Sequence, residues 1–175
     1  MAESRHTAPP DVSIRRLRWA RFLRRVFFVL ICAILLAGIL DVFGIKSGEA
    51  TASGGGYELT VTYDERTRPG LATTVEVEIR RAGGFQGSVA VSFTSAYFDN
   101  LDLNGVDPEP LGGTSTAEEV MLYFEPPRTG DTMTIGFDAR VQPNVQLRTA
   151  KADVSVLDDA GQPVATARIE TLVMP

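Results

Sequence analysis

The chain has 175 residues and a formal net charge of −5, and this small value conceals two regions of opposite charge. Residues 1–25 hold seven arginines and two carboxylates, whereas residues 46–175 hold ten basic and nineteen acidic residues. Such an acidic region argues against nucleic acid as its ligand. Residues 46–175 also lack histidine and cysteine, the usual base of hydrolytic triads and the usual copper ligands. We therefore expect neither an enzyme nor a cofactor.

The N-terminal part predicts a membrane anchor. Residues 1–25 form a basic tail, and the run Val26–Ile45 is apolar apart from Asp41. A helix of that length spans about 30 Å, the hydrocarbon thickness of a lipid bilayer. Because basic residues flank the cytoplasmic end of such spans, we expect a single-pass plasma-membrane protein with a cytoplasmic N-terminus and residues 46–175 outside. A cleaved export signal is the alternative, because Ala50-Thr51-Ala52 has the form of a signal peptidase site.

Small residues form a stripe along the expected membrane helix. Ala33, Ala37, Asp41 and Gly44 are spaced four, four and three residues apart, which places them on one helix face. One interpretation is that this stripe packs against a helix of another membrane protein, with Asp41 paired there. The other is that Asp41 lies near the outer interface and reaches water.

The rest of the chain is predicted to be a flexible linker and one all-β domain. Residues 46–56, KSGEATASGGG, have the composition of a linker. Over residues 57–175 apolar residues recur with period two in seven segments separated by turn residues, which predicts half-buried strands. These segments are Tyr57–Tyr63, Thr73–Arg81, Ser88–Thr94, Glu119–Glu125, Thr132–Val141, Lys151–Leu157 and Val164–Val173. They fit an immunoglobulin-like antiparallel β-sandwich, with a small barrel as the alternative.

One acidic segment resembles part of a calcium loop. Asn100, Asp102, Asn104 and Gly105 match its first half, in which alternate oxygen ligands precede a glycine bend. Asp107 adds a further carboxylate, but the second half of the motif, with its bidentate glutamate, is missing. Asn100, Asp102, Asn104 and Asp107 are therefore a candidate metal site, and an acidic turn without an ion is the alternative.

Four apolar residues, Tyr97, Phe98, Met121 and Tyr123, are candidate contacts with another protein. The strand around Met121 and Tyr123 is apolar on both faces, although a sandwich strand ordinarily exposes one face to water. Either the long connection over residues 95–118 covers these two side chains, or they mark a protein-binding surface.

The chain contains the short segments RPGLAT (68–73), GGF (83–85), NGVDPEP (104–110), FDARVQP (137–143) and the terminal VMP. Together they resemble a family of actinobacterial single-pass membrane proteins with an immunoglobulin-like outer domain. The resemblance implies a topology and a fold, and no activity. We therefore expect a membrane-anchored protein-interaction domain outside the cytoplasm, serving as accessory subunit or assembly factor of a membrane complex. The alternative is an exported cell-envelope module that binds a ligand or calcium.

Overall fold

The computed structural model describes residues 12–39, 46–146 and 148–174, and within the helix it describes the side chains of residues 19–36. The helix α1 (Val12–Ile39) and the β-sandwich belong to separate compact units. In the described part of the chain, no helix is both long enough and apolar enough to cross a membrane. Ala33 and Ala37 of the predicted stripe fall within α1. Asp41 and Gly44, like the end of the predicted span at Ile45, lie outside the described residues.

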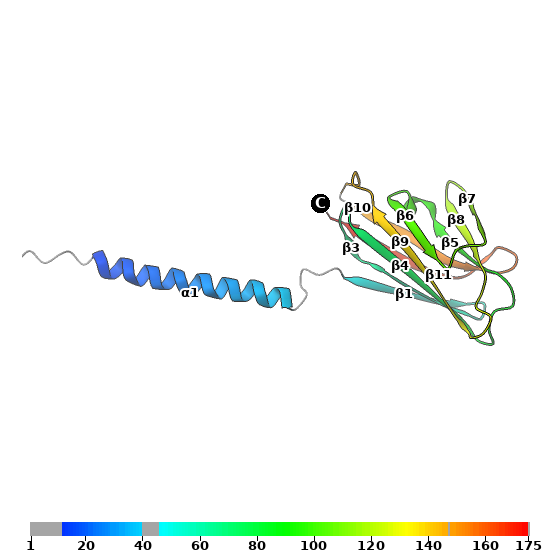
Figure 1. Cartoon of the computed structure of the whole chain (residues 1–175), viewed down its shortest axis with the longest axis horizontal. Helices are drawn as coiled ribbons and strands as arrows, with labels where there is room; N and C mark the ends of the chain where they lie inside the picture. Colours follow the sequence, from blue (N-terminus) through cyan, green and yellow to red (C-terminus); the bar gives the residue numbers. More distant parts are fainter. Residues whose placement is uncertain (1–11, 40–45, 147, 175) are drawn as a thin grey trace, which may run out of the picture. The chain divides into compact units, whose positions relative to one another are not determined.

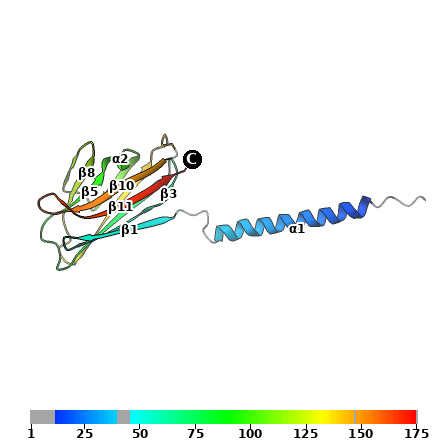
Figure 2. The ribbon, with the colours of Figure 1, turned by 180° about the vertical axis from the view of Figure 1, so that it is seen from behind.

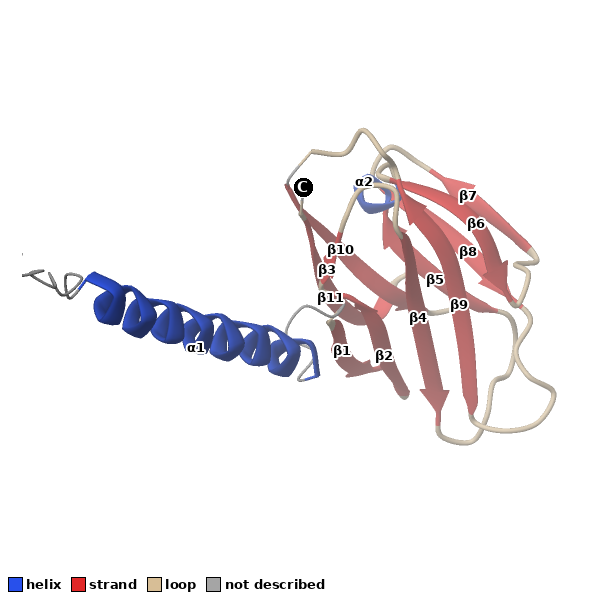
Figure 3. Ribbon diagram, turned by 60° about the vertical axis from the view of Figure 1, so that its left-hand side comes forward, coloured by secondary structure: helices blue, strands red, loops and turns tan. Residues whose placement is uncertain are grey.

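Over the described residues, the sandwich consists of a five-stranded sheet A and a six-stranded sheet B (Figures 1 and 3). Sheet A has the order β1 (Ser47–Gly54), β2 (Tyr57–Asp64), β4 (Ala72–Arg81), β9 (Thr132–Val141) and β6 (Leu101–Asp107). Sheet B has the order β3 (Arg66–Thr67), β11 (Pro163–Val173), β10 (Arg148–Leu157), β5 (Val89–Thr94), β8 (Glu119–Phe124) and β7 (Gly112–Ser115), and Figure 2 shows its strands from behind. A one-turn helix, α2 (Ser95–Phe98), follows β5. Neighbouring strands are antiparallel except β3, which is parallel to β11.

Alternation of buried and exposed residues explains the strands that the sequence predicts. All seven predicted segments are strands, and β9 has the predicted bounds. In β4, Val77 and Ile79 are fully buried whereas Glu76 and Glu78 between them are exposed. The prediction of two packed, mainly antiparallel sheets is confirmed. The barrel alternative is wrong, because each sheet ends in edge strands, and the described strands number eleven rather than seven.

The segment expected to be a flexible linker is strand β1, so the linker prediction is wrong. All eight residues of β1 pair with β2. Its small residues permit close packing: a Cβ on Gly54 would collide with the carbonyl oxygen of Val164 in β11. Ala50 and Ala52 pack against the core. The folded domain therefore begins with β1.

The helix α2 turns Tyr97 into the core, so a surface position for Tyr97 is wrong. Phe98 is half-buried and packs against the core. Tyr97 is 4% exposed, and its hydroxyl lies 3.1 Å from the Thr171 hydroxyl, which donates to the Asp64 carbonyl. The ring of Phe98 lies edge to face with Phe93, at a centroid distance of 5.1 Å. Burial raises the pKa of Tyr97 above its ordinary value of 10.0.

A fragment of residues 46–175 should resist urea better than residues 57–175, because the shorter fragment lacks β1 and uncovers the core beneath Ala50 and Ala52. Circular dichroism against urea concentration gives the two unfolding midpoints. Equal midpoints would mean that residues 47–54 act only as a tether.

In the longer fragment, Gly54→Val should lower the free energy of unfolding by about 1–3 kcal/mol, because the added carbon atoms meet backbone. The matched change Ser53→Val, at an exposed position of the same strand, should have little effect. A harmless Gly54→Val would contradict close packing of β1 on β11.

Tyr97→Phe should lower the free energy of unfolding by about 1 kcal/mol, because it removes one buried hydrogen bond while Thr171 keeps its backbone acceptor. The variant should also lose part of the wild-type sensitivity to alkali. Since the folded-state pKa is raised, the stability linked to this group is present below pH 10 and is lost as the pH rises through the folded pKa. Urea unfolding at neutral and alkaline pH measures both effects, with Tyr123→Phe as the exposed control.

Candidate functional site

The segment predicted to be a calcium loop or acidic turn is the edge strand β6, so the loop prediction is wrong. Residues 101–107 pair with β9, with a bulge between Leu103 and Gly105. The side-chain amide of Asn100 donates to the carbonyl oxygen of Ala96 at 2.8 Å. In an extended strand, Asp102 and Asp107 lie about 15 Å apart, too far to bind one ion together with Asn100 and Asn104. Pairing with β9 holds the segment extended on both sides of the bulge.

The other two expected contact residues lie on the outer face of β8. Met121 is half-buried opposite Ser92, and Tyr123 is 37% exposed opposite Ala90. The short strand β7 pairs with β8 and forms the edge of the sheet beside it. Two exposed leucines were missed by the sequence patterns, Leu103 at 48% and Leu111 at 64% exposure. Leu111 stands alone between Pro110 and Gly112, and Leu103 alternates only with Leu101, which is too short a period to predict a strand.

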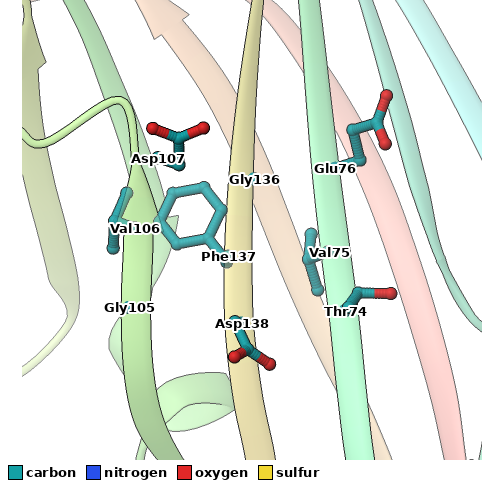
Figure 4. A pocket seen from close by; sticks show the side chains of 9 residues that line it. All are labelled: Thr74, Val75, Glu76, Gly105, Val106, Asp107, Gly136, Phe137 and Asp138. Carbon is teal, nitrogen blue, oxygen red and sulfur yellow. The ribbon is translucent and has the colours of Figure 1, made fainter.

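A shallow groove with a volume of about 400 Å³ lies on the outer face of sheet A, across β4, β9 and β6 (Figure 4). Two neighbouring rows of paired residues across these three strands form it, and each row contains one glycine. The first row is Thr74, Asp138 and Gly105, and the second is Glu76, Gly136 and Asp107. The floor is bare backbone at the two glycines. The rim carries three carboxylates and one hydroxyl.

Nothing in the fold requires glycine at the floor of this groove. A Cβ on Gly105 would meet no atom within 4 Å, and one on Gly136 would meet only the Asp107 carbonyl oxygen, at 3.9 Å. Neither glycine has a positive φ. Glycine inside a strand weakens it, and often marks a bulge or a place where another molecule approaches the backbone. The bulge in β6 adjoins Gly105, but Gly136 lies in a regular stretch of β9.

The rim carboxylates are without basic partners among the described side chains. None of the ion pairs among the described residues involves Glu76, Asp107 or Asp138. Arg140 follows two residues after Asp138 on the same face of β9, and its Nε donates to the carbonyl oxygen of Gly70 at 2.8 Å. The described residues hold no cluster of three or more His, Cys, Asp or Glu side chains arranged to bind a metal. The rim therefore surrounds the groove and does not converge on one point.

The groove adjoins a segment of the chain whose charges all have one sign. Residues 82–127 contain seven acidic residues and no lysine or arginine: Asp99, Asp102, Asp107, Glu109, Glu118, Glu119 and Glu125. This segment forms β5, α2, β6, β7 and β8, with β6 at the edge of sheet A and β7 at the edge of sheet B (Figure 3). We call it the acidic flank. It supplies −7 of the net −9 (ten basic, nineteen acidic) of residues 46–175.

No family model and no curated protein matches the sequence. Solved structures are similar at low identity. A chain of a type I cohesin–dockerin complex from Clostridium thermocellum is 12% identical with a TM-score of 0.48, over 69% of this chain and 100% of the other. A type I cohesin from Pseudobacteroides cellulosolvens is 12% identical with a TM-score of 0.42, over 62% and 86%. BcpA, the major pilin subunit of Bacillus cereus, is 10% identical with a TM-score of 0.37, over 63% and 36%. These likenesses carry no functional argument.

Proposed function

We propose that this chain is a membrane-anchored protein-interaction domain outside the cytoplasm, an accessory subunit or assembly factor of a membrane complex. The observation that carries the proposal is the acidic flank, which combines seven carboxylates and no base with the exposed side chains of Leu103, Leu111 and Tyr123. Exposed apolar side chains among charges of one sign favour a partner of opposite charge, because complementary potentials steer and orient association.

The anchor is proposed from the sequence. The run Val26–Ile45 follows a tail with seven arginines and contains one charged residue, Asp41. Its small-residue stripe would pack against a helix of the same partner. Only Lys46 separates the end of this run from β1, which leaves little chain to act as a spacer. Such a short connection favours a partner that is itself in the membrane.

Binding without catalysis agrees with the chemistry available outside the membrane, since residues 46–175 have no histidine or cysteine and only two lysines, Lys46 and Lys151. The calcium-binding alternative is not favoured, because three of its four ligands, Asp102, Asn104 and Asp107, lie on the extended strand β6 beside β9.

The double variant Glu109→Lys/Glu125→Lys should lose most of the membrane protein that co-purifies with the intact chain in neutral detergent. We expect recovery to fall about tenfold or more, because each reversal places like charges in the interface. Quantitative mass spectrometry of the purified complex measures the recovery.

The control is Glu49→Lys/Asp159→Lys, which makes the same change of charge at exposed positions away from the flank. Equal losses in both double variants would remove the flank from the interface. Fractionation of the cells tests the anchor separately: the intact chain should be in the membrane fraction, and a soluble form that begins at Ser53 would contradict it.

A further inference from the structure

We propose that the groove on sheet A binds an arginine side chain of the partner protein, presented by an extended segment that crosses Gly105 and Gly136. This inference rests on the function proposed above and names the chemistry of the partner. The site has three components: an open backbone floor, a rim of carboxylates without basic partners, and the adjoining acidic flank.

The open floor is the first component. Gly105 and Gly136 lie diagonally on neighbouring strands and face the same side of the sheet. A Cβ atom would fit at both positions without a clash, and residues with a side chain stabilise strands better than glycine does. An unfilled pair of positions on the edge strand and its neighbour leaves the peptide planes accessible, as close approach by another chain requires.

The rim selects the ligand chemistry. Glu76, Asp107 and Asp138 stand around the floor (Figure 4) without an ion pair to a described side chain. A guanidinium is planar, so it can lie flat on exposed backbone while its edges donate to carboxylates on more than one side. It is also less strongly hydrated than an ammonium group. The groove therefore favours arginine over lysine.

The surrounding surface favours a protein partner over a metal ion or a second copy of this chain. The rim carboxylates do not gather on one point. Two copies joined at this side would bring together two segments that each carry a charge of −7. The groove is therefore best matched to a basic segment of another protein.

The experiment uses the full chain in neutral detergent and the peptide acetyl-Val-Arg-Val-amide. Nuclear magnetic resonance titration should show millimolar binding, with the largest shifts at the amides of Gly105 and Gly136. The same peptide with citrulline, which keeps the shape and lacks the charge, should bind about tenfold more weakly. Shifts centred elsewhere, or equal affinity for the citrulline peptide, would overturn the proposal.

Filling the groove separates binding from folding. Gly136→Val and Gly105→Val should each leave the melting temperature unchanged or raise it, and each should weaken the arginine peptide about tenfold or more by occupying the floor. Thr134→Val, at an exposed position on the same face of β9, should bind as wild type does. Wild-type affinity in both glycine variants would overturn the proposal, and so would unfolding of both, which would show that the fold itself needs these glycines.

The co-purification assay distinguishes this inference from the function on which it rests. Gly136→Val should lose the membrane partner to a similar extent as Glu109→Lys/Glu125→Lys. If the glycine variant keeps the partner while the charge-reversal variant loses it, the arginine site is wrong and the acidic flank remains the interface. If only the charge-reversal variant keeps the partner, the flank is wrong. Self-association of the chain without peptide would make a second copy the occupant and would overturn the proposal.

Discussion

The contact between Phe93 and Phe137 links the core of this sandwich to its candidate site. The rings come from opposite sheets, β5 and β9, and meet edge to face with centroids 4.8 Å apart. Both side chains are almost completely buried. Because side chains alternate along a strand, the inward position of Phe137 directs its neighbours Gly136 and Asp138 outward. The core contact therefore determines which residues of β9 form the groove.

The sequence predicts the strands in which apolar and polar residue types alternate, because this alternation reflects which side chains are buried. In β9 the residues Met133, Ile135 and Phe137 are buried in turn, so a period of two reveals the strand and its bounds. The four strands that were not predicted do not show a comparable alternation of buried residues. Every residue of β7 (GGTS) is exposed, and β3 has only two residues. The strand β6 is rich in Asn, Asp and Gly, and it is extended because β9 lies beside it. For such strands the neighbour in the sheet decides the conformation, and local pattern does not show the neighbour.

The candidate site was predictable only in part, for a similar reason. Asp107 was expected to be functional as a calcium ligand, whereas the structure places it on the rim of a groove. The groove itself depends on the register between β4, β9 and β6, which makes Gly105 and Gly136 diagonal neighbours. The sequence alone does not give the register between distant segments. The acidic flank, by contrast, was visible: residues 82–127 contain no basic residue. A net charge summed over the whole domain hides this, because the remaining residues balance to within two charges.

Glycine is required by packing at one position of this fold and is not required at another, and only the atoms around each glycine distinguish the two cases. At Gly54 a side chain would collide with the backbone of Val164, so packing of β1 accounts for the glycine and no ligand is needed. At Gly136 the space above the backbone is open and φ is not positive, so the folded chain gains nothing from glycine there. A residue that weakens its own strand without serving the fold is the kind of local inconsistency that functional sites produce. The two residues are identical in the sequence. The space around each backbone shows that one glycine serves packing while the other leaves room for a partner.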